Sequence, residues 1–371
     1  MSDDAAAPEP APSDPPQKTR RPRLSTGKKL GFALVTVLGL IGVTEGFFRV
    51  REWTRSMRRH TLSPRVPDTY RHLVLKPNTR FESPSGFVME TNSLGMREKE
   101  VSAEREPWVK QRILCVGGST TFGLYTSAND KTWPAQVQRI LHERGYPGVE
   151  VLNGGVPAWD LRTSQTNLEL RLYDLKPDVV ICYHAYNDLV ANLDPRYAED
   201  SKVDDVSELW RPLRASAFYR FLRKHLQDPG EQLRKKAETL SDEGTAGFER
   251  NLRRFVRRTR EVGAQPVICS YPSALRPTLE ESEAAGVPGL DRWFGDLSPF
   301  AYPTLIEGLK RYNATITKVT EDEGIPRPQV AEKMPHDVKL YASTVHHTDE
   351  GEVLVAQIVA QALIDAGIVT K

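Results

Sequence analysis

The chain has 371 residues, of which 39% are hydrophobic and 27% are charged, with 51 basic and 49 acidic side chains. This length and apolar content suffice for one large or two ordinary domains with a buried core. The formal net charge of +2 excludes a strongly basic polyanion-binding protein, so the sequence predicts no nucleic-acid partner. The 3 cysteines are too few for a disulfide framework. Each lies in a short apolar run, which predicts a buried and inert thiol.

The N-terminal region changes composition along its length. Residues 1–29 are first rich in proline and acidic side chains and then basic, which predicts a disordered tail. Residues 30–44 carry no charge, and Glu45 interrupts the apolar run before Phe48. Counted to residue 48, the run approaches the roughly 20 residues that a helix needs to cross a bilayer. We predict a transmembrane anchor over residues 30–48, with a cleaved signal peptide as the alternative.

Basic side chains flank this apolar run on both sides, in nearly equal number. The positive-inside rule therefore gives little direction to the orientation of the anchor. We expect a single-pass membrane protein with the N-terminus inside and the bulk of the chain extracytoplasmic. Residues 49–111 are predicted to be a linker and N-terminal extension, and residues 112–371 the main domain.

Short apolar strands alternate with helical periods in this main domain. Strands are predicted at 112–116, 149–153, 178–183 and 265–270, and helices at 133–144, 160–175, 248–262, 303–320 and 353–366. Such alternation indicates an α/β fold with a parallel sheet that is covered on both faces. In open sheets of this kind, chemical groups gather where the strands end.

Four short blocks follow these predicted elements. They are, in chain order, Gly117-Gly118-Ser119, Asn153-Gly154-Gly155, His184-Ala185-Tyr186-Asn187-Asp188, and the stretch from Ser343 to Gly351 that contains His346. A serine at a glycine-containing strand-to-helix turn exposes its hydroxyl, and the helix N-terminus offers N–H groups to a developing anion. For the first block alone, a phosphate-type glycine loop or a plain turn is the alternative. Asp188 is expected to be a helix cap, and Asp349 with Glu352 a capping box.

Together, the four blocks resemble those of the SGNH hydrolases, the GDSL-like esterase and lipase superfamily. Residues 91–97 are also similar to a lead-in of membrane-tethered members. The resemblance implies a flavodoxin-like three-layer sandwich with a five-stranded parallel sheet. It also implies that Ser119 is the nucleophile and His346 the general base. The oxyanion hole would then consist of the N–H groups of Ser119 and Gly155 and the side-chain amide of Asn187.

The last block departs from the family pattern, because Ser343 stands three residues before His346 where the family has an aspartate. Changing such an orienting carboxylate to an amide costs about 10⁴ in kcat in serine proteases. A serine oxygen accepts an imidazole N–H but supplies no full negative charge. Three alternatives remain open: Ser343 orients His346, a carboxylate such as Asp337 does so, or catalysis is impaired.

These observations predict a serine-dependent ester hydrolase that acts through an acyl-serine intermediate. Its expected substrate is an O-acyl group on a cell-envelope glycan or lipid. An O-acyltransferase with the same serine and histidine is one alternative, and a non-catalytic envelope-binding protein that retains the fold is another. We expect no metal and no other cofactor, because His184 and His347 lack carboxylate partners at a fixed ligand spacing.

Overall fold

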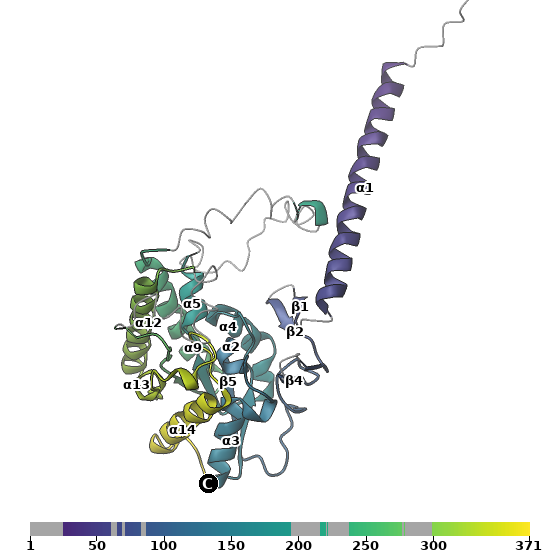
Figure 1. The fold of residues 1–371 in the computed structure, drawn as a ribbon. Helices are drawn as coiled ribbons and strands as arrows, with labels where there is room; N and C mark the ends of the chain where they lie inside the picture. Colours follow the sequence, from purple (N-terminus) through teal and green to yellow (C-terminus); the bar gives the residue numbers. More distant parts are fainter. Residues whose placement is uncertain are drawn as a thin grey trace, which may run out of the picture.

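The computed structural model describes residues 25–60, 65–68, 71–82, 87–193, 216–219, 221, 237–276, 278 and 299–371. Most of the predicted disordered tail, residues 1–24, lies outside these ranges. The helix α1 (Thr26–His60) comes first and projects away from the rest of the chain (Figure 1). Two antiparallel hairpins follow, β1 (Arg65–Asp68) with β2 (His72–Leu75) and β3 (Arg80–Glu82) with β4 (Val88–Glu90).

A parallel sheet lies at the centre of the main domain. Its strands are β5 (Gln111–Gly117), β6 (Val149–Asn153), β7 (Val179–Tyr183) and β8 (Gln265–Ile268), in the spatial order β6-β5-β7-β8. Every residue of β5 and β7 is buried, as expected for central strands that are covered on both faces. Cys115, Cys182 and Cys269 are buried and free, which confirms the prediction of buried thiols. The predicted α/β fold with a parallel sheet is likewise confirmed.

Helices cover both faces of this sheet. The chain runs from β5 to β6 in one direction and then returns past β5 to β7, so right-handed crossovers place their helices on opposite faces. On one face, α3 (Trp133–Glu143) packs against α14 (Asp349–Asp365). On the other, α9 (Asp242–Glu261) packs against α4 (Leu161–Leu170) and α12 (Tyr302–Asp322). The shorter helical elements are α2 (Ser119–Phe122), η1 (Asn129–Lys131), η2 (Leu172–Leu175), α5 (Tyr186–Ala191), α13 (Val330–Lys333) and η5 (Val338–Leu340).

A short extended segment occupies the place beside β8 where a fifth strand would lie. The N–H of Ile268 donates to the carbonyl of Pro326 at 3.3 Å, and the N–H of Ser270 donates to that of Pro328 at 3.1 Å. In a parallel ladder, the return bond to Ile268 would come from the N–H of residue 328, which a proline lacks. The described residues therefore contain four parallel strands rather than the expected five, with a one-sided ladder at the fifth position.

Three helix boundaries differ from the sequence-based expectation. The predicted helix 160–175 is interrupted at Arg171, whose φ of −150° ends α4 before η2. The helix α9 starts at Asp242 rather than 248, because Ser241 caps it ahead of the apolar stripe. Asp349 is the first residue of α14 and not its cap: the Thr348 hydroxyl accepts the Gly351 N–H instead.

Two acidic side chains cap helices other than their own. The Asp188 carboxylate, on α5, accepts the N–H of Leu161 at 2.9 Å, at the start of α4. Glu352, on α14, accepts the N–H of Trp133 at 2.6 Å, at the start of α3. Asp188 is thus a cap, as expected, whereas Glu352 does not take part in the predicted capping box. Each bond satisfies an N–H that has no partner within its own helix.

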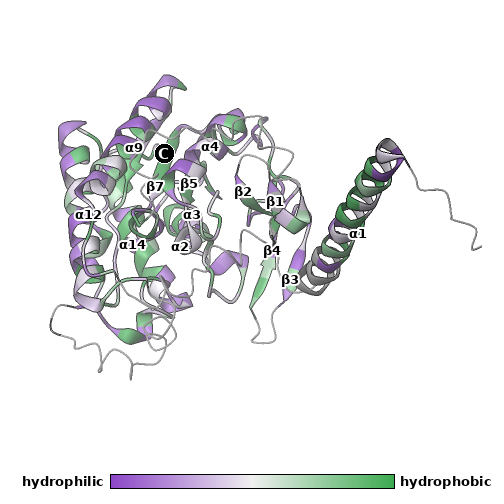
Figure 2. Cartoon of the chain, turned by 90° about the horizontal axis from the view of Figure 1, so that it is seen from above, coloured by the Kyte–Doolittle hydropathy of each residue, from purple (hydrophilic) through white to green (hydrophobic). Residues whose placement is uncertain are grey.

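The helix α1 presents an apolar surface along its first two thirds. The stretch Thr26–Arg51 is long and apolar enough to cross a bilayer, and Figure 2 colours much of α1 as hydrophobic. Most of its large hydrophobic side chains are exposed in the isolated chain. The helix continues unbroken to His60, past the end of the predicted anchor.

Candidate active site

Ser119 lies at the carboxyl end of β5, where the sheet order places β6 on one side and β7 on the other. It is the first residue of α2, so its own N–H has no acceptor within the helix. A Cβ atom at Gly117 would lie 2.0 Å from the Thr121 hydroxyl, and one at Gly118 would lie 2.5 Å from Nδ2 of Asn187. Both glycines are therefore needed for the close approach of neighbouring groups around the serine.

His346 contacts both Ser119 and Ser343. Its Nε2 lies 2.7 Å from the Ser119 Oγ, and its Nδ1 lies 2.6 Å from the Ser343 Oγ. For Nε2 to accept the Ser119 proton, Nδ1 must carry the other hydrogen and donate it to Ser343. The three side chains thus form a continuous hydrogen-bonded series from the turn after β5 to the loop before α14.

The environment of His346 favours its neutral form. The residue is 3% exposed, and burial, with a further contribution from neighbouring His347, lowers the pKa of His346 to about 3. A neutral imidazole is the form that accepts a proton from a hydroxyl. The hydroxyl of Ser343, the partner of Nδ1, carries no negative charge that would counter the effect of burial on this pKa.

Other candidate groups near the last block have different partners. Asp337 is exposed, and its carboxylate accepts the N–H of Lys339 at 3.0 Å, so it caps η5 rather than facing His346. The buried His184 lies between the Ser164 hydroxyl at 2.8 Å and the Asp188 carboxylate at 3.5 Å. Within the described ranges, no group of three side chains is arranged to ligate a metal ion.

Asn187 lies beside the turn that carries Ser119. Its Nδ2 donates to the carbonyl of Trp159 at 2.7 Å, which fixes the amide next to Gly118. An amide nitrogen carries two hydrogens, so this bond leaves a second N–H for an acceptor near Ser119. Trp159 belongs to the block after β6, and its carbonyl is a positioning contact that the sequence did not indicate.

Gly155 packs directly against α2. A Cβ atom there would lie 2.3 Å from the Phe122 nitrogen and 2.7 Å from the Thr121 carbonyl carbon, so only glycine fits without displacing backbone. Its N–H donates to the Asn153 Oδ1 at 3.0 Å. The Gly155 N–H can therefore donate to an oxyanion at Ser119 only if it divides its hydrogen bond between that oxyanion and Asn153 Oδ1, or gives up its bond to Asn153 Oδ1.

Arg97, the last residue of the segment 91–97, contacts the C-terminal end of α2. The guanidinium is buried and donates to the carbonyls of Phe122 at 3.0 Å and Gly123 at 2.5 Å, and to the Thr126 hydroxyl at 2.8 Å. It thereby satisfies carbonyls at the C-terminal end of the turn that Ser119 begins. The sequence marked residues 91–97 but not this contact.

Tyr125 is a further residue that sequence reasoning missed. Its ring meets the His346 ring edge to face, with centroids 5.2 Å apart, and it is 39% exposed. It covers one side of the imidazole and faces solvent on the other. Neither its spacing nor its flanking residues indicated this position, which depends on the loop after α2.

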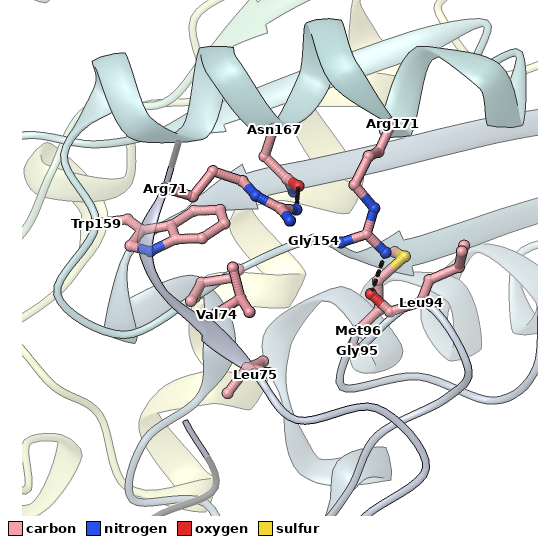
Figure 3. A pocket seen from close by; sticks show the side chains of 12 residues that line it. Arg71, Val74, Leu75, Leu94, Gly95, Met96, Gly154, Trp159, Asn167 and Arg171 are labelled. Atoms are coloured by element: carbon pink, nitrogen blue, oxygen red, sulfur yellow. Dashed lines mark hydrogen bonds between the residues drawn. The ribbon is translucent and has the colours of Figure 1, made fainter. Parts of the chain in front are cut away.

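A small cavity lies behind the block that follows β6 (Figure 3). Its volume is about 20 Å³, which holds about one water molecule and is too small for an acyl group. At its wall, Arg71 donates to Asn167 Oδ1 at 2.8 Å and Arg171 donates to the Leu94 carbonyl at 2.6 Å. These bonds attach the N-terminal extension to α4.

Comparison with known proteins places this arrangement in a family. The model of the GDSL-like lipase and acylhydrolase family matches residues 115–354, a range that includes Ser119, Gly155, Asn187 and His346. The chain belongs to this family. It is therefore an enzyme of the ester-hydrolysing, GDSL-like acylhydrolase type. A search among curated proteins found no match.

Solved structures of similar fold include several hydrolases. An α/β hydrolase from the metagenome of Lake Arreo is 13% identical, with a TM-score of 0.43 over 71% of this chain and 98% of its own. An acetyl xylan esterase variant from Geobacillus stearothermophilus is 13% identical, with a TM-score of 0.44 over 69% and 95%. A lipase/acylhydrolase from Enterococcus faecalis is 16% identical, with a TM-score of 0.43 over 70% and 97%.

Proposed function

We propose that this GDSL-like acylhydrolase cleaves O-acyl esters through an acyl-serine intermediate on Ser119. The observation that carries the proposal is the contact of 2.7 Å between His346 Nε2 and Ser119 Oγ. A serine hydroxyl is a weak nucleophile until a neighbouring base removes its proton as it attacks. His346 takes that proton and later gives it to the leaving alcohol, and water then attacks the acyl-serine.

The groups around Ser119 support the tetrahedral intermediate of this reaction. The Ser119 N–H and the second amide hydrogen of Asn187 are donors next to the attacked carbon. The Gly155 N–H becomes a third donor when it gives up its hydrogen bond to Asn153 Oδ1 or divides it between that oxygen and the oxyanion. Removing one donor of such a hole typically costs about 10²–10³ in rate. Ser343 is the positioning residue that holds the tautomer of His346.

We further propose that the substrate is an O-acyl group on a cell-envelope glycan or lipid and that the enzyme acts outside the cytoplasm as a single-pass membrane protein. The length and apolar surface of α1 support membrane attachment. We assign residues 71–111 to the hydrolase domain, because Arg71 and Arg97 form hydrogen bonds with it.

A fluorophosphonate probe tests the nucleophile directly. The full chain in detergent is treated with the probe, beside Ser119→Ala, His346→Ala and Ser127→Ala. Ser127 is the matched control, because it is an exposed serine near the site whose hydroxyl contacts Asp349. We expect labelling of the wild type and of Ser127→Ala, slow labelling of His346→Ala, and none of Ser119→Ala. A folded wild type that neither reacts with the probe nor hydrolyses p-nitrophenyl acetate would refute the proposal.

A further inference from the structure

The apolar helix α1 contains an acidic residue whose hydrogen bonds come from a distant part of the chain. The Glu45 carboxylate accepts the Ser216 hydroxyl at 2.7 Å, the Ala217 N–H at 2.9 Å and the Phe218 N–H at 3.2 Å. Arg49 adds a fourth donor at 2.7 Å. A carboxylate inside a membrane helix is costly unless it is paired, and here it has both a counter-charge and three further donors.

Aromatic contacts extend the same interaction by two turns of α1. The Phe48 ring lies 5.3 Å from that of Phe218 and 4.4 Å from that of Phe221, measured between centroids. The Arg51 guanidinium lies 4.7 Å from the centroid of the Phe221 ring. We call residues 216–219 and 221 the docking segment. Figure 1 shows it beside α1, apart from the sheet.

Burial along α1 follows this contact. Most residues in the range 25–51 are exposed. The partly buried ones are Thr44, Glu45, Phe48 and Arg51. Their spacing of three and four residues defines one face of a helix. The docking segment therefore covers a specific face, and the remaining surface of the apolar span stays open to lipid.

The position of this face along α1 corresponds to the edge of a bilayer. Glu45 lies about 22 Å along the axis from Leu30, at 1.5 Å per residue, and Arg51 lies about 9 Å farther. With Leu30 at one border of a hydrocarbon core of about 30 Å, the contact falls at the opposite border. An Arg side chain can place its apolar stem in this interface and its charge in water, and Phe is among the residues that interfacial segments bury at this depth. Phe218 is 37% exposed, and Phe47 and Val50 on the same stretch of α1 are also exposed.

We propose that the docking segment is a second membrane contact, which seats an insertion of the hydrolase domain on α1 and places the Phe218 ring in the lipid at the bilayer surface. The proposal rests on α1 as a membrane helix and goes beyond the esterase activity. The insertion joins α5, which carries Asn187, to α9. The contact therefore gives the chain a second point at the bilayer surface besides the span of α1.

Paired cysteines test the contact in the full chain. Phe48→Cys with Phe221→Cys should form a disulfide under mild oxidation in vesicles, whereas Val43→Cys with Phe221→Cys should not, because Val43 lies on another face and is 73% exposed. The three native cysteines are buried and give a low background. Absence of the first disulfide in folded protein would overturn the proposal.

Lipid quenching tests the bilayer as the partner. A nitrobenzoxadiazole label at Phe218→Cys should lose emission in phosphatidylcholine–phosphatidylglycerol vesicles whose acyl chains carry a nitroxide. The same label at Lys371→Cys should keep its emission, since the C-terminus lies at the far end of the domain from α1 (Figure 1). A disulfide at 48 and 221 without quenching at 218 would overturn the membrane contact, because the segment would then be only an internal support. Probe labelling of Ser119 in the same vesicles reports on the esterase separately.

Discussion

The residue that most distinguishes this site is Ser343, which holds Nδ1 of His346 without a negative charge. The hydroxyl keeps the imidazole in the tautomer that accepts a proton from Ser119, so the geometry of a three-residue relay is retained. In the proposed mechanism, Ser343 orients the imidazole but supplies no full negative charge to the imidazolium. The proposal therefore assigns Ser343 an effect on orientation more than on charge.

We expect Ser343→Asp to raise kcat/KM toward a p-nitrophenyl ester by up to about tenfold, the typical difference between a hydrogen bond to a charged group and one to a neutral group. The carboxylate also raises the pKa of His346, so the acid limb of the kcat/KM profile should move to higher pH. Ser343→Asn is the matched control, because it has the same size and no charge, and it should not exceed the wild type. Equal kcat/KM values for the two variants would contradict the view that the absence of a negative charge at position 343 limits the rate.

Stability should fall as the pH is lowered, because of His346. Its pKa is about 3 in the folded chain and returns to about 6.5 on unfolding. Between these values the unfolded chain binds more protons, so the free energy of unfolding decreases with falling pH. From pH 7 to pH 5 this group should cost about 2 kcal/mol.

Urea denaturation of the wild type and of His346→Gln measures this contribution. The difference in free energy of unfolding, wild type minus variant, should be larger at pH 7 than at pH 5. A difference that stays constant between the two pH values would show that His346 titrates alike in both states.

At the scale of elements, the site depends on close backbone contact between α2 and the loop after β6. Gly155 lies on the Thr121–Phe122 peptide, Asn187 from α5 is held by the Trp159 carbonyl of the same loop, and Arg97 holds the C-terminal end of α2. Three segments far apart in the chain thus fix a helix of only four residues. Such a short helix has little stability of its own.

We expect Gly155→Ala to reduce the rate of fluorophosphonate labelling of Ser119 by about 10²-fold, the effect of a displacement near 1 Å at a reacting group. The added methyl group lies 2.3 and 2.7 Å from two backbone atoms. These atoms belong to one peptide unit, so relieving the contact requires the whole unit to move. Stability should fall by about 2 kcal/mol, as for an overpacked site.

Gly148→Ala is the control for this substitution. A Cβ atom at Gly148 meets only the flexible Lys110 side chain, at 2.9 Å and beyond, so labelling should remain near the wild-type rate. Thermal unfolding of both variants separates loss of fold from displacement of Ser119. Full labelling in Gly155→Ala would show that the loop and α2 adjust independently.

For the whole molecule, α1 and the hydrolase domain have opposite kinds of surface, and the docking segment contacts Glu45 of α1. The hydrolase domain has its own buried sheet and helices, whereas α1 exposes its apolar side chains. These opposite surfaces indicate that the domain requires α1 for location rather than for folding.

Removing residues 1–61 should therefore release the protein from the membrane and leave fluorophosphonate labelling of Ser119 intact. Ultracentrifugation of lysates, followed by probe labelling of the supernatant, measures both properties. The full chain should remain in the membrane pellet, with an intact mass that includes residues 30–48. A membrane-free product that begins near Glu45 would instead indicate a cleaved signal peptide.

The sequence alone determined the elements that local patterns encode. Apolar runs bounded by turns predicted all four strands of the sheet, because burial on both faces requires apolar side chains at most positions of a strand. The resemblance of the four blocks to the SGNH hydrolases brought Ser119, Asn187 and His346 into one hypothesis, and the strand ends of a parallel sheet gave three of the blocks a common edge. Caps were less accessible: Glu352 acts on a helix far away in sequence, so no local pattern reveals its partner.

Only the tertiary structure decided how the departures from the family pattern are resolved. Ser343, rather than Asp337, faces His346, because the loop before α14 turns one toward the ring and the other toward η5. Pro328 has no N–H to donate to Ile268, so the segment beside β8 makes only half of the hydrogen bonds of a parallel ladder. Glu45, which interrupts the apolar run in the sequence, has three of its four hydrogen-bond donors more than a hundred residues away. Contacts of this kind follow from the path of the chain in space, and residue spacing carries no record of them.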